Sequence, residues 1–315
     1  MITEIISKIV SESLLSLYPS IVKNIDIPFD MKLLTRFVPY SLISFLFIDY
    51  KFIKENLFSK TGLLLSLTTM IHIYASYKGF EGLESGVAYT IFYTYPLMIL
   101  LMAGEKISPM LLVPLIGVAL LVYENIETKE HLENLDEKTN EKTNEKTNEK
   151  TNEKTNEKTN EKTNEKTNEK TEEKEDYTII SFSVFMVFTA AFTEALLYFI
   201  VRDLKTKNNW NHLFISYFLG AVLLLGSLFV NPNGISFNIL LKSSFIVNMV
   251  IGLFGYFLSF YAMTRLEPSI YAPLSYVGII MSHIYGGVFN GDIITWKKGL
   301  GSLLIIAPNV YMKLK

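Results

Sequence analysis

The sequence predicts an all-α, polytopic membrane protein with about ten transmembrane helices, arranged as two inverted five-helix repeats. Half of the 315 residues are apolar, and the mean hydropathy is +0.28. Charged residues are concentrated between Glu124 and Asp176, which leaves the remainder of the chain poor in charge for a water-soluble protein. That remainder contains a series of apolar stretches of about 20 residues, the length with which a helix crosses a bilayer.

Nine stretches have the length and composition of membrane spans: residues 31–49, 60–79, 85–103, 108–123, 178–201, 212–230, 239–262, 268–289 and 297–312. A tenth segment, residues 3–23, is interrupted by Glu4, Lys8 and Glu12. Their four-residue spacing places all three on one helical face, so the segment either crosses the membrane or lies along its surface as an amphipathic helix. The apolar residues from Leu14 to Val22 favour a crossing.

A polar linker, residues 125–176, separates the two groups of spans. The unit EKTN occurs eight times in succession from Glu137 to Asn168. A helix would stack Glu on Glu and Lys on Lys four residues apart, which is repulsive, and the repeat has nothing apolar to bury. The sequence therefore predicts a disordered linker, which is either a solvated tract without further role or a docking segment for a partner.

Three short motifs occur in both halves, in the same order and at a nearly constant offset: Ser11–Leu15 with Thr193–Leu197, Gly82–Ser85 with Arg265–Ser269, and Gly104–Ser108 with Gly291–Thr295. This pattern predicts a duplication, with residues 1–124 and 177–315 as five-helix halves. Because five is odd, the second half would enter the membrane upside down, as in many secondary transporters. Both termini then share one side, which the Lys and Arg residues of the short loops mark as cytosolic. The sequence does not indicate which membrane holds the chain.

Several further motifs stand in the predicted spans and turns: Tyr18-Pro19, Thr35-Arg36-Phe37, the tyrosine-rich stretch Tyr89–Leu97, Gly104-Glu105-Lys106, Leu266-Glu267-Pro268, Pro273, Gly291-Asp292 and Gly301. Together they resemble the EamA-like family of the drug/metabolite transporter superfamily, over nearly the whole chain except the linker. Two features depart from the family pattern, namely Asp292 where the family usually has Glu and the long acidic linker. The resemblance implies a ten-helix carrier of a small metabolite, and it does not choose among amino acids, nucleotide sugars and phosphorylated sugars.

Carboxylates inside predicted spans are the first candidates for functional residues, because a charge at the bilayer centre costs at least a few kcal/mol. Glu194 lies well inside the sixth span, and Tyr198 follows one turn later on the same face. Glu194 is either a hydrogen-bonded structural carboxyl or a substrate or proton site between the halves. Glu12 is its counterpart in the repeat, and two carboxyls brought together would suit proton coupling. Alternatively, Glu12 belongs to a polar helix face at the membrane surface.

Aromatic and imidazole side chains form a second set of candidates. Tyr89 and Tyr93 share one face of the fourth span, and Tyr271 lies in the matching ninth span. Such residues usually pack, yet phenols that face a central cavity can stack on and hydrogen-bond a polar solute. His72 and His283 are either buried, hydrogen-bonded side chains or parts of a proton relay or substrate contact.

Prolines predict breaks or kinks in two of the spans. Pro96 lies in the fourth span, and Pro268 and Pro273 lie in the ninth. The carbonyl groups that a break frees need a protein or water partner, so these helices are candidates for lining a cavity. A simpler explanation for Pro268 is that it begins its helix, a position that proline favours.

The composition also bounds the function. The chain has no cysteine, no common hydrolase, nucleotide-binding or metalloprotease motif, and a net charge close to zero. We therefore expect no enzyme activity, cofactor, metal site or nucleic-acid partner. The expected partners are a small-molecule substrate, a coupling proton as a candidate, and membrane lipid; nothing in the sequence supports a homo-oligomer. The predicted function is a secondary transporter that works by alternating access, and the alternative is a transport-inactive scaffold that recruits a partner through the EKTN linker.

Overall fold

The computed structural model describes residues 1–24, 27–104, 113, 116–124, 161–230 and 242–314. This part of the chain forms helices and no strand, as expected for the all-α class. Its helices are α1 (Ile2–Leu15), α2 (Tyr18–Asn24), α3 (Phe29–Phe45), α4 (Tyr50–Asn56), α5 (Lys60–Glu81), α6 (Ser85–Phe92), α7 (Tyr95–Met102), α9 (Glu161–Asp203), α10 (Asn209–Val230), α11 (Ser243–Met263), α12 (Pro268–Ser275), α13 (Val277–Tyr285), the π-helix η4 (Gly286–Asn290) and α14 (Trp296–Leu314).

Within the described ranges, six helical segments are long and apolar enough to cross a membrane: Ile2–Asn24, Ser85–Met102, Thr178–Asp203, Asn209–Ser227, Phe245–Met263 and Pro268–Asn290. The first segment, for which the sequence left two possibilities, is among them. The spans expected at 31–49, 60–79 and 297–312 are helical as α3, α5 and α14 but do not belong to the six. Of the span expected at 108–123, residues 113 and 116–123 are described and helical, whereas residues 108–112 and 114–115 lie outside the described residues.

Apolar side chains cover the outside of the bundle, whereas charged side chains lie inside it. Leu42 and Phe185 are 65% and 63% exposed, but Lys8 and Arg36 are only 0% and 2% exposed. This is the reverse of a water-soluble domain, because lipid accommodates apolar side chains while an intramembrane charge must face protein or a water-filled cavity. The chain is therefore an integral, multi-pass membrane protein.

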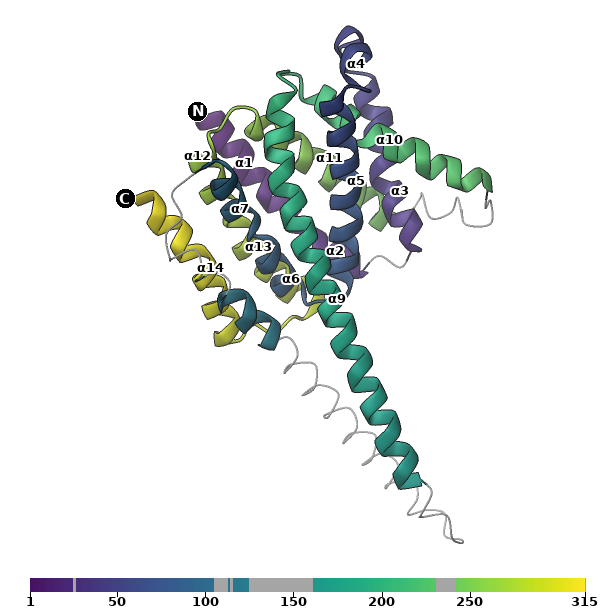
Figure 1. Ribbon diagram of the computed structural model, residues 1–315, viewed down its shortest axis with the longest axis vertical. Coiled ribbons are helices and arrows are strands. Elements are labelled where there is room, and N and C mark those ends of the chain that lie inside the picture. Colours follow the sequence, from purple (N-terminus) through teal and green to yellow (C-terminus); the bar gives the residue numbers. More distant parts are fainter. Residues whose placement is uncertain (25–26, 105–112, 114–115, 125–160, 231–241, 315) are drawn as a thin grey trace.

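The helices run between two ends of the bundle. Figure 1 places both chain termini at one end, which we call the terminal end, and α9 projects far beyond the other, which we call the linker end. α5 packs along α9 and α1 along α11, while α3 packs against α10. α6 packs against α13, and α7 against α12. Each of these contacts joins the first half of the chain to the second, so the core is shared between the halves.

Three of the membrane segments are broken rather than continuous. The first is interrupted between α1 and α2 at Ser16 and Leu17, and the second between α6 and α7. The third is interrupted between α12 and α13 at Tyr276. Pro96 stands in the first turn of α7, Pro268 begins α12 and Pro273 lies inside it, which confirms the breaks expected in the fourth and ninth spans. The breaks bring short helix ends to the middle of the bundle.

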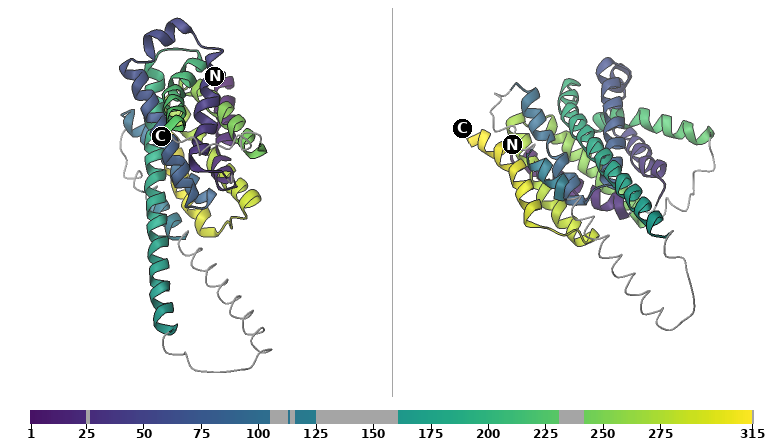
Figure 2. Two further views of the ribbon diagram at one scale, coloured as in Figure 1. Left: turned by 90° about the vertical axis from the view of Figure 1, so that its right-hand side faces the viewer. Right: turned by 60° about the horizontal axis from the view of Figure 1, so that its bottom comes forward.

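The linker differs from expectation in its second part. α9 begins at Glu161, within the segment 125–176 that we expected to be a disordered linker, and Figure 2 shows it continuing away from the bundle. The physical reason is that an existing apolar helix can be extended at one hydrogen bond per residue without a new nucleation cost. Residues 125–160 lie outside the described residues, so the docking role considered for the linker stays untested.

Candidate functional site

Five ionisable side chains meet inside the bundle and form what we call the polar cluster: Lys8, Glu12, Arg36, His72 and Glu194. All five are buried, with at most 3% of any residue exposed. They come from α1, α3, α5 and α9, four helices that are far apart in the sequence. Burying so many ionisable groups is expensive unless they pair, so their partners indicate what each one does.

Lys8 and Glu12 form an ion pair one turn apart on α1. Tyr93 donates a hydrogen bond to Glu12 Oε2, and Tyr95 donates one to Oε1 at 3.0 Å. The Lys8 ammonium also lies 3.5 Å from the centre of the Tyr271 ring, within the range of a cation–π interaction. Tyr93 and Tyr95 flank the break between α6 and α7, which turns both phenols towards α1. Both charges of this pair are therefore fully partnered.

Arg36, on α3, is surrounded by rings instead of by acids. Its guanidinium carbon lies 4.5 Å from the ring centre of Tyr18, 5.5 Å from that of Tyr77 and 4.8 Å from that of Tyr256. Two of its nitrogens, Nε and Nη2, are buried without a hydrogen-bond partner. Buried polar groups are nearly always hydrogen-bonded, so these two donors mark a position that is incomplete in the protein alone.

His72 and Glu194 bring α5 and α9 together. His72 Nδ1 lies 3.1 Å from the carbonyl oxygen of Ala190, so in the neutral ring this nitrogen carries the proton. Nε2 then accepts a hydrogen bond from Tyr256 at 2.8 Å. Glu194 Oε2 lies 3.5 Å from the same Nε2 and has no hydrogen-bond partner. Glu194, like Arg36, therefore keeps an unsatisfied polar atom in the interior.

The structure brings several of the sequence-predicted residues to this cluster. Glu12 and Glu194 are both members and interact electrostatically. Tyr93 contacts Glu12, and Tyr271 contacts Lys8. Tyr89 is buried beside them, with its ring centre 4.9 Å from that of Tyr93.

Two other predicted residues lie apart from the cluster. The Tyr198 hydroxyl donates to the carbonyl oxygen of Leu266 at 2.8 Å and accepts from Arg202 at 2.9 Å, near the terminal end. Only its ring, 5.0 Å from that of Tyr271, reaches towards the cluster. His283 Nε2 instead lies 3.0 Å from the Ser302 hydroxyl, between α13 and α14.

Sequence reasoning did not select Lys8, Arg36, Tyr95 or Tyr256 as site residues. Lys8 was visible as a charge one turn before Glu12, but the pattern fitted a surface-facing helix equally well. Arg36 lies in the third turn of α3 and is buried. An arginine inside an apolar segment was the available signal, since such residues are costly and often functional.

A comparison with known protein families finds a match in the second part of the chain. Residues 181–308 match the EamA-like transporter family. This part of the chain is similar to that family. The match confirms the resemblance seen in the sequence motifs for the second half and identifies a transporter fold in general terms. A comparison with curated proteins finds no match.

The EamA-like half supplies only part of the polar cluster. Of the five cluster residues, Glu194 lies within the matched residues, as do the neighbouring Tyr256 and Tyr271. The other four cluster residues precede the matched segment in the chain: Lys8, Glu12, Arg36 and His72. The cluster thus lies at the junction of the two halves. In the described parts of the chain, no group of three or more acidic or histidine side chains is placed to hold a metal ion.

Polar contacts close the bundle at the linker end. Lys32 donates to Glu81 at 2.9 Å, and Lys298 forms an ion pair with Glu84. Asn290, in the EamA-like half, accepts from Asn24 and donates to Ser85, both at 2.6 Å. These contacts join the start of α3 to the end of α5, the end of α2 and the start of α6 to η4, and the start of α6 to α14.

A second set of contacts closes the terminal end. Thr61 donates to Asp203 at 3.0 Å, which ties the start of α5 to the end of α9. Arg202 donates to the carbonyl oxygen of Leu266 at 2.7 Å, which ties α9 to the loop before α12. Asn211 accepts from the backbone N–H of Asp49 at 2.8 Å. Polar contacts thus link the helices at both ends of the bundle, and the polar cluster is buried between them.

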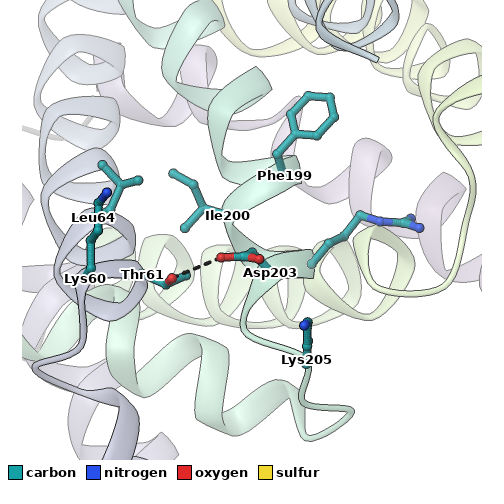
Figure 3. A pocket seen from close by; sticks show the side chains of 8 residues that line it. Lys60, Thr61, Leu64, Phe199, Ile200, Asp203 and Lys205 are labelled. Carbon is teal, nitrogen blue, oxygen red and sulfur yellow. Dashed lines mark hydrogen bonds between the residues drawn. The ribbon is translucent and has the colours of Figure 1, made fainter. Parts of the chain in front are cut away.

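A pocket of about 650 Å³ opens at the terminal end, outside the polar cluster (Figure 3). It is lined by α5, α9 and the residues after α9: Lys60, Thr61, Leu64, Phe199, Ile200, Arg202, Asp203 and Lys205. Most of its charged side chains are exposed, and the Thr61–Asp203 hydrogen bond crosses it. We take the polar cluster as the candidate site, because its charges are buried and partly unpartnered whereas those of the pocket are largely solvated.

Proposed function

We propose that the chain is a secondary carrier that moves a small polar metabolite across a membrane by alternating access, with the polar cluster as its binding site. The main support is the combination of a transporter-family fold with buried, incompletely partnered charges at the junction of its halves. A protein that used these residues only for stability would gain by pairing or replacing them. A carrier instead needs polar groups that a solute can satisfy.

We also propose that the two halves are inverted repeats. The packing of α5 on α9 and of α1 on α11 supports this, because a twofold relation that exchanges the halves would exchange these two contacts. Residues at matching positions make them: Ser11 donates to the Gly255 carbonyl oxygen on α11, and Thr193 lies beside His72 on α5. Under the same twofold relation, three contacts would lie on the twofold axis: α3 with α10, α6 with α13 and α7 with α12.

Alternating access then requires the two closed ends to open in turn. The linker end would open by separating Lys32 from Glu81 and Asn290 from Ser85. The terminal end would open by separating Thr61 from Asp203 and Arg202 from the loop before α12. Hydrogen bonds and ion pairs of this kind are individually weak where water reaches them, so solute binding could shift the balance between the states.

Within this mechanism Glu194 has the central role, supported by Tyr256 and His72, and Glu12 and Tyr93 position α1. Tyr89 and Tyr271 would form an aromatic wall of the site, and Tyr198 and His283, which lie apart from the cluster, would act on it only indirectly. A proton is the candidate coupling ion, because Glu194 interacts electrostatically with both Glu12 and Arg36 and its Oε2 is free to accept a donor.

The test is uptake into liposomes that contain the purified chain. The liposomes are exposed to a metabolite extract, and their contents are compared with those of protein-free liposomes by mass spectrometry. We expect selective accumulation, which Glu194→Gln abolishes or uncouples from an imposed proton gradient. The matched control is Glu55→Gln, which neutralises an exposed carboxylate at the terminal end. Unchanged uptake by Glu194→Gln at every pH tested would remove Glu194 from the mechanism.

A further inference from the structure

We propose that Arg36 binds a single carboxylate group of the transported solute, through the edge of its guanidinium formed by Nε and Nη2. The inference rests on the proposed carrier function and deepens it, because it assigns a chemical class to the substrate. It follows from the partners of Arg36, its surroundings and the distribution of charge in the polar cluster.

The geometry of the two free donors is the first argument. Nε and Nη2 lie on the same side of the planar guanidinium, so their N–H bonds point in parallel and can hold both oxygens of one carboxylate. Both nitrogens lack a partner, although Arg36 is only 2% exposed. Leaving two charged donors unsatisfied in the interior is costly, and a bidentate oxyanion would relieve that cost at both atoms at once.

The surroundings of Arg36 are the second argument. Among the described residues, no carboxylate forms an ion pair with Arg36. The phenol of Tyr217 lies beside the guanidinium and interacts with it electrostatically and through a side-chain hydrogen bond. The ring centres of Tyr18 and Tyr256 lie 4.5 Å and 4.8 Å from the guanidinium carbon. The position thus offers a buried cation with two unpartnered donors, a neighbouring phenol hydroxyl and aromatic rings, which suit a carboxylate attached to an apolar or planar body.

The charge distribution argues for one carboxylate rather than a phosphate dianion. Lys8, the other buried cation of the cluster, is already neutralised by Glu12. Glu194 lies within electrostatic range of Arg36 and would oppose a second negative charge. One unpaired cation can therefore balance one negative charge, whereas a doubly charged phosphate would leave an uncompensated charge in a buried site.

The test uses the same liposome uptake with the wild-type chain, Arg36→Lys, Arg36→Gln and the control Lys54→Gln, which removes an exposed cation at the terminal end. We expect every solute accumulated by the wild type to carry a carboxylate. Arg36→Lys keeps the charge but loses the planar fork, so uptake at low solute concentration should fall at least about tenfold, and Arg36→Gln should abolish it. Lys54→Gln should match the wild type.

Tyr217→Phe provides a second variant that keeps the ring and removes only the hydroxyl beside Arg36. It should raise the solute concentration needed for half-maximal uptake without lowering the melting temperature, and it serves if Arg36→Gln does not fold. Accumulation of phosphate esters or neutral solutes that lack a carboxylate would overturn the inference but leave the carrier intact, as would wild-type uptake by Arg36→Lys. If the wild type accumulates nothing, the carrier function itself fails.

Discussion

Glu12 and Glu194, which the proposed repeat places at matching positions, have different surroundings. Glu12 is paired with Lys8 and accepts from Tyr93 and Tyr95. Glu194 has one ring nitrogen at 3.5 Å and an oxygen without a hydrogen bond. Burial is equal for the two, at 3% exposure. Two equally buried carboxyl groups thus differ in one respect: Glu12 is paired within the protein, whereas Glu194 has an oxygen without a hydrogen-bond partner.

The two buried cations follow the same division. Lys8 is satisfied within the protein, whereas Arg36 presents two free donors. We therefore expect changes at the Lys8–Glu12 pair to act mainly on stability, and changes at Arg36 and Glu194 to act mainly on transport. Variants at these residues test whether stability and transport depend on different parts of the polar cluster.

Lys8→Met should have the largest effect on stability. It leaves the Glu12 carboxylate buried without its cation, and breaking such a pair costs about 3–5 kcal/mol. The free energy of unfolding, measured by denaturant titration in detergent micelles, should fall by this amount. Lys8→Met combined with Glu12→Gln should recover part of the loss, since no unpaired charge remains. A fully additive double variant would show that the pair is not coupled.

Gly278→Ala should have an intermediate effect, again through the Glu12 side. A methyl group at Gly278 would collide with the Tyr93 hydroxyl, which donates to Glu12. Overpacking of a tight interior contact costs about 1–3 kcal/mol, here with loss of a hydrogen bond. The melting temperature of the purified protein measures the effect, with Gly299→Ala, where an added methyl meets nothing within 4 Å, as the control. Equal melting temperatures for the two variants would contradict the role of Tyr93.

Glu194→Gln should have the smallest effect on stability. It removes a charge that has only one polar contact, so the free energy of unfolding should change by less than about 1 kcal/mol. The same variant is expected to lose coupled transport, so its uptake should fall while its free energy of unfolding changes little. A loss as large as that of Lys8→Met would place Glu194 among the residues that hold the bundle together.

The sequence predicted the membrane class, the broken fourth and ninth spans and the two carboxylates, because all three leave local signals. Periodic apolar stretches, prolines and charges inside spans can be read without knowing the packing. The tyrosine partners of Glu12 could not be read, since Tyr93 and Tyr95 reach Glu12 only in the folded bundle. Tyr198 was selected for its place one turn after Glu194, but the chain turns its hydroxyl towards Arg202 and the terminal end.

The helical start of α9 at Glu161 was also beyond sequence reasoning. The repeat has poor helix-forming residues and stacked like charges, which predicts disorder when it is considered alone. An adjoining apolar helix changes that expectation because it supplies the nucleus. Interior packing and helix extension are thus the two effects that local patterns did not capture.

The central claim is that the polar cluster is reached from each side of the membrane in turn. The chain has no cysteine, so Ser76→Cys introduces a single thiol with little change in size. Ser76 is 4% exposed, and its hydroxyl lies 3.5 Å from His72 Nε2. A control thiol at Lys54→Cys, on the exposed terminal end, should react from one side only.

The decisive measurement is the rate at which a membrane-impermeant thiol reagent, added to one side or the other of oriented vesicles, modifies Ser76→Cys. Alternating access predicts modification from both sides, slowed in each case by a transported solute. Modification from one side alone, or from neither side while solute is being taken up, would contradict the account.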